Sequence, residues 1–492
     1  PVTDPSVRDS QQMRTQRRRE RRPVDAEGAR SSRLLRESLL VGAVAAIARF
    51  VVILWAAPRF PAAADGTFYH RLASRLAIGA GYTWLWDDGT VTPAAHYPVG
   101  YPALLAGPYA LFGASPTVAM VVAGLLGTIA VVCTYRVAAR EMRGRAPLFA
   151  GLLVALHPAL LPYTAALMTE GVTASLFAIV LACREPRGGT SPVRRLGLTL
   201  AASALGGLLV LVRPQNLLLL PFLALATSPP SARWKQRLLR AALGPVLALA
   251  FVVPWTARNC REMHRCALVS VNGGWNLLIG AHATSGGWSP VPVPSACKEV
   301  WDEAGKDLCF ERAAKKDIAE HPVSFLALVP RKLANTFEYV GAAGWYLHTS
   351  NAEAFPERAK NVLGTIETIF LRCVLAAALF VQASRWGKGR PAGWKWAAAV
   401  AGLAVVSATV GYVALAALAV RKRATPLEMT TAAAVLSTAA VHAVFFGAGR
   451  YALVVLPFVA VLAARVFSSR LPGSFSPSAA LAASSERAKP VS

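Results

Sequence analysis

Residues 39–57 read LLVGAVAAIARFVVILWAA, and residues 64–102 read ADGTFYHRLASRLAIGAGYTWLWDDGTVTPAAHYPVGYP. The first stretch is long and apolar enough to cross a bilayer as a helix. It follows a very basic segment, and basic flanks stay on the cytoplasmic side, so the second, polar stretch is expected outside the cytoplasm. Asp65 lies where the two stretches meet. The sequence therefore predicts a membrane protein whose first outer loop contains residues 64–102.

The rest of the chain repeats this pattern of long apolar runs broken by short basic links. Of its 492 residues, 54% are hydrophobic and only 16% are charged, which is typical of a polytopic membrane protein. The formal net charge is +26. Much of the excess Lys and Arg falls between apolar runs and at the N-terminus, so we interpret it as topology signalling and not as nucleic-acid binding.

This order of segments predicts an all-α polytopic membrane protein with about 11 to 13 transmembrane helices and extracytoplasmic loops that cap a site. The protein is expected in the plasma (inner) membrane, with its N-terminus cytoplasmic and its site facing the periplasm or the cell exterior. Five regions are expected: a disordered basic cytoplasmic tail over 1–37, an N-terminal transmembrane module over 38–255 with its first outer loop at 58–117, an extracytoplasmic loop domain over 256–360, C-terminal transmembrane helices over 361–467, and a disordered tail over 468–492.

The C-terminal half leaves one topological ambiguity. Basic links at Arg385–Arg390 and Arg421–Arg423 both have the composition of cytoplasmic segments. Only one long apolar run separates them. Either this run enters the membrane and returns, or one of the two links lies outside.

Most of the cysteines fall in the long polar stretch after Pro254, at Cys260, Cys266, Cys297 and Cys309. In an oxidising compartment, an even number of clustered cysteines predicts one or two disulfides and leaves their pairing open. The spacing is not that of a zinc site, so metal ligation there is the less favoured interpretation. Whether a divalent metal takes part elsewhere is left open, and the sequence assigns no cofactor.

Several polar residues converge on the outer face if this topology holds. A carboxylate at the end of a membrane helix is costly unless it is paired, so such residues suggest a site. Taken singly, each has a structural explanation, because arginines extend their charge to the interface and tyrosines anchor helix ends. The candidate site residues are Asp65, Tyr69, His96, Tyr97, Tyr101, Glu170, Arg213, Arg258 and Arg450.

The order of short motifs resembles that of the GT-C glycosyltransferases, in the branch of protein O-mannosyltransferases and lipid A aminoarabinose transferases. The matches are spread over most of Leu39–Phe467. Several relatives have a second acidic residue where this chain has Gly66, and more often a proline where it has Val99. The matching motifs are Asp65-Gly66-Thr67-Phe68-Tyr69, Tyr97-Pro98-Val99-Gly100-Tyr101-Pro102, Thr169-Glu170, Arg213-Pro214, Pro254-Trp255-Thr256-Ala257-Arg258-Asn259 and Gly449-Arg450-Tyr451.

The resemblance implies an inverting glycosyltransferase that moves a hexosyl or pentosyl group from a polyprenyl-phosphate carrier to an acceptor hydroxyl. In that family the acidic residue of the first loop is taken as the catalytic base, which corresponds to Asp65. Arginine forks suit phosphate, so Arg213, Arg258 and Arg450 are candidate phosphate ligands. Glu170 either holds the acceptor or pairs with an arginine. Contacts with sugar or prenyl groups are expected from Tyr69, His96, Tyr97 and Tyr101.

The expected partners are a polyprenyl-phosphate sugar, membrane lipids, and an acceptor that is a protein, a lipid A-like lipid or a glycan. The alternative function is a polyprenyl-lipid or glycolipid transporter or flippase, in which charged residues would line a path across the bilayer. Most of the charges that can be placed lie at helix ends and not in mid-span, which favours the transferase.

Overall fold

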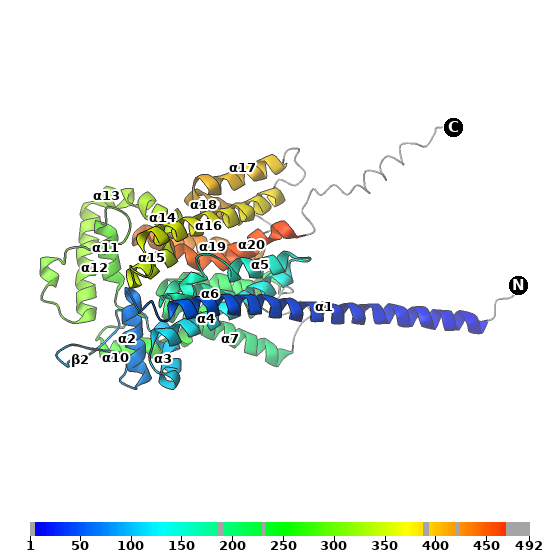
Figure 1. The fold of residues 1–492 in the computed structure, drawn as a ribbon, viewed down its shortest axis with the longest axis horizontal. Coiled ribbons are helices and arrows are strands. Elements are labelled where there is room, and N and C mark those ends of the chain that lie inside the picture. The colour runs from blue at the N-terminus through cyan, green and yellow to red at the C-terminus, as the bar shows by residue number, and fades with distance from the viewer. Residues whose placement is uncertain (1–4, 185–190, 229–231, 387–392, 420–423, 469–492) are drawn as a thin grey trace.

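The computed structural model describes residues 5–184, 191–228, 232–386, 393–419 and 424–468. Helices dominate these residues, and their only sheet is a two-stranded hairpin. The long helices run side by side along the length of the molecule, whereas α2 and α12 stand across it (Figure 1). The predicted all-α polytopic membrane class is confirmed.

Six helices in the described residues are long and apolar enough to cross a membrane. A seventh span results if the bent pair α9 (Trp234–Ala250) and α10 (Val253–Glu262) counts as one. The predicted total of about 11 to 13 stays a prediction. The six are Ser31–Ala56 of α1 (Pro5–Ala56), α4 (Pro116–Glu141), α7 (Pro192–Val212), Glu357–Arg385 of α16 (Glu357–Trp386), α19 (Pro426–Val444), and Gly449–Phe467, which joins η4 (Gly449–Val455), α20 (Leu456–Ala463) and η5 (Ala464–Phe467).

Three of these spans begin with the same local signal, a hydroxyl residue followed by proline. The hydroxyl oxygen accepts a hydrogen bond from the backbone N–H three residues on, at 3.3 Å in each case. Proline at the first helical position costs nothing, since its missing N–H would have no partner there. The three starts are Ser115-Pro116, Ser191-Pro192 and Thr425-Pro426.

Shorter apolar helices lie between the long ones. At about 1.5 Å per residue, α5 (Ala146–Ala155) and α6 (Thr169–Ala182) are roughly 15 and 21 Å long, well short of a hydrocarbon core of about 30 Å. Arg49 of α1 donates to the carbonyl of Ala155 at 3.4 Å, so α5 stops about two turns below the end of α1. The chain from α5 to α6, which includes η1 (Pro162–Ala165), therefore lies deeper in the molecule than the ends of the longer helices around it. A further short pair is η2 (Pro214–Leu219) with α8 (Leu220–Thr227).

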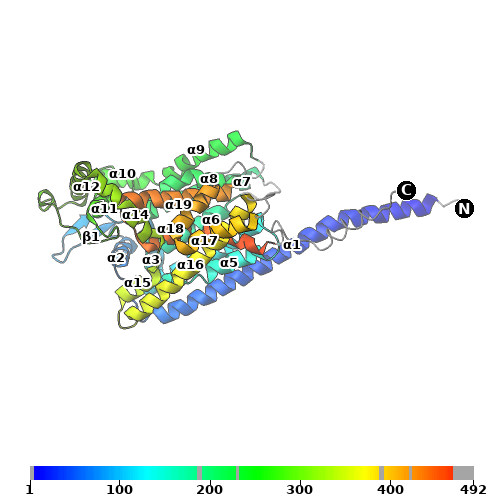
Figure 2. The ribbon, with the colours of Figure 1, turned by 90° about the horizontal axis from the view of Figure 1, so that it is seen from above.

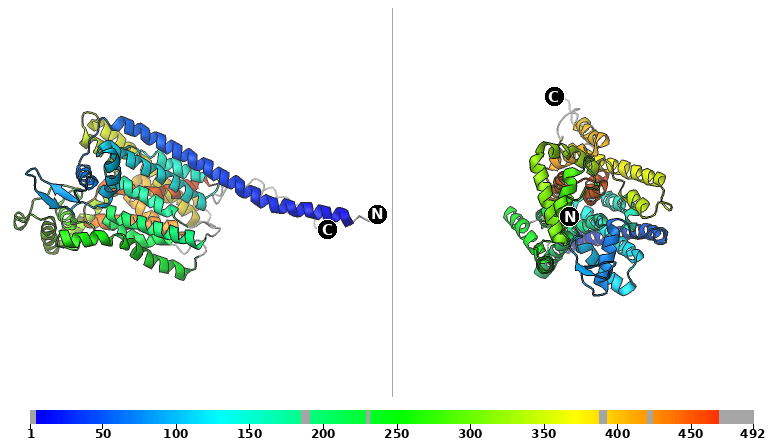
Figure 3. Two further views of the ribbon diagram at one scale, coloured as in Figure 1. Left: turned by 90° about the horizontal axis from the view of Figure 1, so that it is seen from below. Right: turned by 90° about the vertical axis from the view of Figure 1, so that its left-hand side faces the viewer.

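The polar segments are folded and gather at the end of the molecule opposite to the start of α1 (Figures 1 and 2). The first loop forms α2 (Asp65–Ala77), the hairpin β1 (Thr83–Leu85) and β2 (Val91–Pro93), and α3 (Gly100–Phe112). Figure 3 shows this end face-on. Residues 256–360, which we call the cap, contain the end of α10, α11 (Gly273–His282), η3 (Ser295–Cys297), α12 (Glu303–Glu320), α13 (Pro322–Ala327), α14 (Val329–Phe337) and α15 (Ala342–Ser350).

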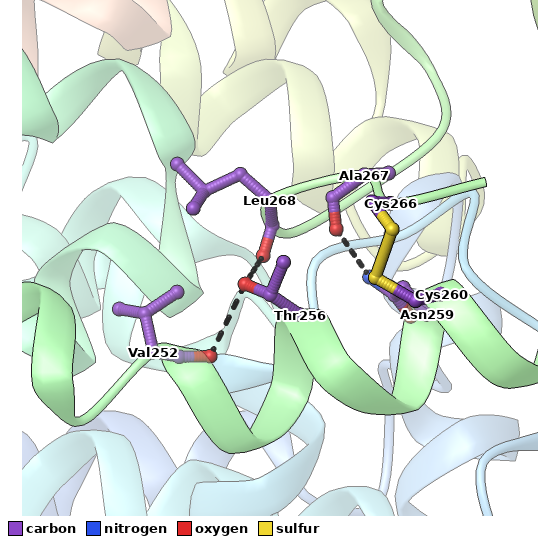
Figure 4. The surroundings of a disulfide bond; sticks show 7 residues. All are labelled: Val252, Thr256, Asn259, Cys260, Cys266, Ala267 and Leu268. Atoms are coloured by element: carbon purple, nitrogen blue, oxygen red, sulfur yellow. Dashed lines mark hydrogen bonds between the residues drawn. A yellow bond between two sulfur atoms is a disulfide. The ribbon is translucent and has the colours of Figure 1, made fainter.

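The cap cysteines form two disulfides, Cys260–Cys266 and Cys297–Cys309, which confirms the predicted cross-linking and decides the pairing. Next to the first bond, the Asn259 side chain donates to the carbonyl of Ala267 at 3.0 Å, and Thr256 donates to that of Leu268 at 2.9 Å (Figure 4). The second bond ties η3 to α12. Both cross-links lie within the cap and close short loops in it.

The apolar run after α16 is two helices, α17 (Gly393–Val406) and α18 (Ala408–Ala419). They fold back on each other, since a Cβ on Gly411 would lie 3.0 Å from the Cα of Ala404. A run that turns at Ser407 enters and leaves at the same face, which agrees with the first of the two alternatives above. The flanking links, Arg385–Arg390 and Arg421–Arg423, lie largely outside the described residues.

The N-terminal segment differs from the predicted unstructured tail over 1–37. Helix α1 begins at Pro5 and continues without a break into the first span. Gln, Arg and Glu, which are frequent in this segment, are good helix formers, and a preceding turn extends an existing helix at little cost. Residues 1–4 and most of the predicted C-terminal tail, 469–492, lie outside the described residues.

Candidate active site

A cavity of about 2800 Å³ lies between the membrane helices and the cap. It is much larger than the roughly 300–1,000 Å³ of ordinary small-molecule sites, so it has room for two bulky substrates. Most of the predicted site residues line it, whereas Arg258 and Tyr101 do not. The predicted residues in its wall are Asp65, Tyr69, His96, Tyr97, Glu170, Arg213 and Arg450.

Two carboxylates and two guanidinium groups form a chain of contacts in this wall. Arg213 Nη1 lies 2.8 Å from Glu170 Oε1, and Arg450 Nε lies 3.4 Å from the same oxygen. Arg450 Nη2 lies 3.4 Å from Asp65 Oδ2. The Glu170 side chain is 2% exposed and that of Asp65 is 37% exposed. Of these two carboxylates, Asp65 is therefore the one that is open to the cavity.

Glu170 is fully engaged by its neighbours. Tyr163 donates its hydroxyl to Glu170 Oε2 at 2.8 Å, while both arginines face Oε1. Arg213 also donates to the hydroxyl of Thr169 at 3.3 Å. Of the two tasks expected for Glu170, the structure shows pairing with arginine. The second positive charge of the two guanidinium groups is balanced by Asp65, which pairs with Arg450.

The arginines are also held by aromatic rings. The Cζ atoms of Arg213 and Arg450 lie 5.0 and 5.2 Å from the centroid of the Tyr451 ring, and Arg450 lies 5.8 Å from that of Trp345. His442 stacks on Tyr451 with centroids 3.9 Å apart. In the described residues, Arg450 makes one hydrogen bond, from Nη2 to Tyr451 at 3.3 Å, and its buried Nε–H has no hydrogen-bond partner. Its other polar contacts are the ion pairs with Glu170 and Asp65, both at 3.4 Å.

An aromatic wall surrounds Asp65 on its other side. The Tyr97 hydroxyl donates to Asp65 Oδ1 at 3.5 Å, a long contact. Tyr97 stacks on Phe68 at 5.0 Å and meets the edge of Tyr69 at 5.2 Å. Burial, and then the charge of Asp65, raise the pKa of the Tyr97 phenol, so it stays a protonated donor. Tyr101 stands behind Tyr69 at 5.5 Å, fully buried and away from the cavity.

The backbone around Asp65 is tightly confined. Ala64 has φ 49°, a left-handed conformation that side chains rarely adopt, and Asp65 then opens α2. A Cβ on Gly66 would lie 2.9 Å from the Leu167 carbonyl and 3.0 Å from the Tyr346 hydroxyl. The position at which relatives carry a second acidic residue therefore has no room for a side chain in this chain.

The motif at the end of the first loop packs directly on the helix that carries Arg213. A Cβ on Gly100 would lie 2.5 Å from the backbone of Leu211 and Val212. Helix α7 ends immediately before Arg213. This close approach therefore fixes the position of Tyr97 relative to the arginine pair, Arg213 and Arg450. Only glycine allows the two backbones to be this near.

Arg258 serves the first loop and not the cavity. Its Nη2 donates to the carbonyl of Tyr82 and its Nη1 to that of Ala94, both at 2.8 Å. The guanidinium also lies 5.0 Å from the Trp255 ring centroid. Since both ends of the fork are bound to backbone, the geometry gives Arg258 a structural contact in place of the phosphate contact expected from the sequence.

One cap residue that the sequence did not single out contacts the first loop. The Glu303 carboxylate accepts hydrogen bonds from the Trp84 indole and from the N–H groups of Ala95 and His96. Burial lowers the pKa of the His96 imidazole, and the carboxylates of Glu303 and Asp307 oppose this shift. No motif marks Glu303, because its partners lie more than two hundred residues away in the chain.

The described residues contain no group of three or more His, Cys, Asp or Glu side chains placed to hold a metal ion.

No protein-family model matches the chain, and no curated protein does. Its fold is similar to that of AglB, an oligosaccharyltransferase from Archaeoglobus fulgidus solved with an inhibitory peptide and a dolichol-phosphate. That similarity covers 92% of this chain and 52% of that chain, at 15% identity and a TM-score of 0.43. ArnT from Cupriavidus metallidurans, bound to undecaprenyl phosphate, is 16% identical with a TM-score of 0.37, over 87% of this chain and 76% of that one.

Both neighbours have the GT-C fold, which is the fold of the glycosyltransferases whose motifs the sequence of this chain resembles. The chain spans about half the length of the archaeal enzyme. At these identities the likeness is one of general architecture.

Proposed function

We propose that this protein is a membrane glycosyltransferase that moves a sugar from a polyprenyl-phosphate carrier to an acceptor hydroxyl, with inversion at the anomeric carbon. The observation that carries the proposal is that Asp65, a carboxylate open to the cavity, pairs with Arg450, which in turn shares the buried carboxylate of Glu170 with Arg213. This arrangement offers a base and an anion-binding group in one wall.

In the proposed reaction, Asp65 takes the proton of the acceptor hydroxyl. The acceptor oxygen then attacks the anomeric carbon from the side opposite the phosphate, and a new glycosidic C–O bond forms. The bond between the anomeric carbon and the phosphate oxygen breaks, and its electron pair leaves with polyprenyl phosphate. A single displacement inverts the anomeric carbon and requires no covalent enzyme intermediate.

The charges of the wall suit this chemistry. Glu170 and Asp65 balance the charges of Arg213 and Arg450 before the reaction. Once Asp65 has taken the acceptor's proton, one positive charge is in excess, and it complements the single negative charge of the phosphate. As the bond to phosphate breaks, negative charge grows on the leaving oxygen, and arginines fixed by Tyr451 and Trp345 stabilise it without reorganising. The predicted roles of Tyr69, His96 and Tyr97 as contacts for sugar or prenyl groups are retained. We leave Arg258 and Tyr101 out of the substrate contacts.

We place the cavity on the extracytoplasmic side of the plasma (inner) membrane, with α1 entering from the cytoplasm. The basic residues before the first span favour this orientation. The two cap disulfides favour it as well, because such bonds persist in oxidising compartments.

Asp65→Asn tests the proposal, with Asp87→Asn as the matched control in the same loop, where Asp87 is exposed. Mass spectrometry of glycolipids, glycoproteins and glycans from cells with and without the chain identifies the product. We expect Asp65→Asn to abolish that product at unchanged protein level and Asp87→Asn to keep it. A normal amount of product with Asp65→Asn would remove the proposed base. Prenyl-lipid transport in vesicles without any sugar transfer would instead assign a transporter.

A further inference from the structure

Near the end of the first loop, the backbone of residues 94–96 is held mainly by the cap. Arg258 donates to the carbonyl of Ala94 at 2.8 Å, and the N–H of Val271 donates to the carbonyl of Ala95 at 2.9 Å. The N–H groups of Ala95 and His96 donate to the Glu303 carboxylate at 2.6 and 2.9 Å. Four consecutive polar groups of the loop backbone are therefore hydrogen-bonded to cap residues.

Glu303, like Arg258, joins two parts of the loop, and it is the only carboxylate among these holding groups. The same carboxylate also accepts from the indole N–H of Trp84, which lies in β1. A carboxylate that accepts three N–H groups forms charge-assisted hydrogen bonds, which are about twice as strong as neutral ones. The β hairpin and residues 95–96 are thus fixed to one point at the start of α12.

The cap fixes that point in turn. Asp302 caps α12 by accepting from the N–H of Gly305 at 2.6 Å. The disulfide Cys297–Cys309 brackets Glu303 on both sides along the chain. The carboxylate consequently has little freedom to follow the loop if the loop shifts.

The held segment leads directly into the contact with the proposed base. Tyr97 follows His96, its carbonyl accepts from the Tyr82 hydroxyl at 2.7 Å, and its own hydroxyl lies 3.5 Å from Asp65. A shift of the His96 backbone would therefore move the Tyr97 ring relative to Asp65.

We propose that Glu303 is a positioning residue, which through the backbone of Ala95 and His96 fixes Tyr97 against Asp65 and so makes the cap a part of the active site. Its catalytic consequence rests on the function proposed above. In this role Glu303 touches no substrate. The contact whose geometry it controls is the one between Tyr97 and Asp65. Without Glu303, the arginine pair keeps its geometry, because Arg213 and Arg450 are held by Glu170 and Tyr451.

The test compares Glu303→Gln with Glu299→Gln, an exposed glutamate at the start of the same segment, in the full chain reconstituted in lipid nanodiscs. A carboxamide keeps the shape but points an N–H₂ group at one of the three donors. We expect hydrogen exchange of the peptide over 94–101 to become about tenfold faster in Glu303→Gln. Nitration of Tyr97 by tetranitromethane is expected to increase, while peptides of α12 keep their protection. Glu299→Gln is expected to change none of these.

The functional arm measures transfer as the rate of formation of the product that the Asp65→Asn comparison identifies, and binding of undecaprenyl phosphate as the probe of the arginine pair. We expect transfer to fall by about tenfold to a hundredfold in Glu303→Gln and binding to stay within twofold. Unchanged exchange, or faster exchange with a normal transfer rate, would overturn the positioning role. If the unaltered chain transfers no sugar, the proposed function fails, and exchange with Tyr97 nitration still decides whether Glu303 holds the loop.

Discussion

Asp65 and Glu170 carry the same functional group, and their surroundings give them different tasks. Glu170 is buried and bound by Tyr163 and two arginines, so it serves to hold charge in place. Asp65 has one distant tyrosine and one edge of Arg450, and it faces the cavity. A free lone pair on a carboxylate in a cavity is what a general base requires.

Arg450→Lys tests whether the guanidinium shape matters. Lysine carries a single point of charge and cannot face Glu170 and Asp65 at once while lying over Tyr451 and Trp345. We expect product formation to fall by about tenfold to a hundredfold, as measured in membranes by mass spectrometry. Arg312→Lys, at an exposed cap position, is the control and should transfer normally. Normal transfer by Arg450→Lys would show that only its charge is used.

Gly66→Ala tests the tight packing beside the proposed base. The added methyl group would meet the Leu167 carbonyl and the Tyr346 hydroxyl, and such overpacking costs about 1–3 kcal/mol. We expect a lower unfolding temperature of the purified protein together with reduced transfer, since Asp65 is the neighbouring residue. Gly107→Ala is the matched control, because a Cβ there meets nothing within 4 Å. Equal unfolding temperatures for the two variants would contradict the expected clash.

The α17–α18 hairpin depends at its tip on one carboxylate from the end of α14. Glu338 accepts hydrogen bonds from the N–H groups of Ala408 and Thr409, both at 3.0 Å, and pairs with Arg372 at 2.8 Å. These N–H groups open α18 and have no partner within their own helix. An element that joins two short helices is thus fixed to the neighbouring cap by polar contacts at its turn.

Glu338→Gln should therefore loosen the hairpin and change its pH dependence. Burial opposes ionisation of Glu338, but hydrogen bonds from Ser407 and Thr409 outweigh it and lower the pKa. A lowered pKa in the folded state stabilises the fold above the unfolded value of about 4.3, and this stabilisation is lost as pH falls through the folded value.

We expect the unfolding temperature of Glu338→Gln at pH 7 to drop, and the difference from the unaltered protein to shrink below about pH 4. Thermal unfolding across this pH range measures both. The control is Glu320→Gln, whose nearest charge, Lys316, lies 3.9 Å away at the surface. A constant difference at all pH values would show that the ionised form of Glu338 contributes nothing.

At the scale of the whole molecule, the pairing of α17 with α18 predicts on which side of the membrane their ends lie. Both ends of the hairpin should lie on the side where α1 begins. In a background without Cys133, Cys183 and Cys373, we expect Gly393→Cys and Ala424→Cys to resist a membrane-impermeant maleimide in intact cells. Trp301→Cys, at a highly exposed cap position, should react. Reaction of only one of the two hairpin ends would mean that the run crosses the membrane once.

The residues that the sequence grouped into one site make different contacts in the structure. The sequence predicts Arg213, Arg258 and Arg450 at outer helix ends, so it treats them as equivalent. Two of them share Glu170, whereas Arg258 turns to the carbonyls of Tyr82 and Ala94. Sequence position alone could not separate them, because the direction of a long side chain depends on acceptors that come from elsewhere in the chain.

Composition and local pattern determined the membrane class, the order of apolar segments and the cysteines of the cap, because burial in lipid and the choice of a helix are decided within about twenty neighbouring residues. The candidate base was also marked locally, by its place directly after the first span. Tertiary structure decided the pairing of Glu170 with two arginines, the hold of Glu303 on the first loop and the return of the α17–α18 run. The first two join groups that lie far apart in sequence, and the turn between α17 and α18 is held by Glu338 of the cap, so the free energy of these contacts exists only once the helices have packed.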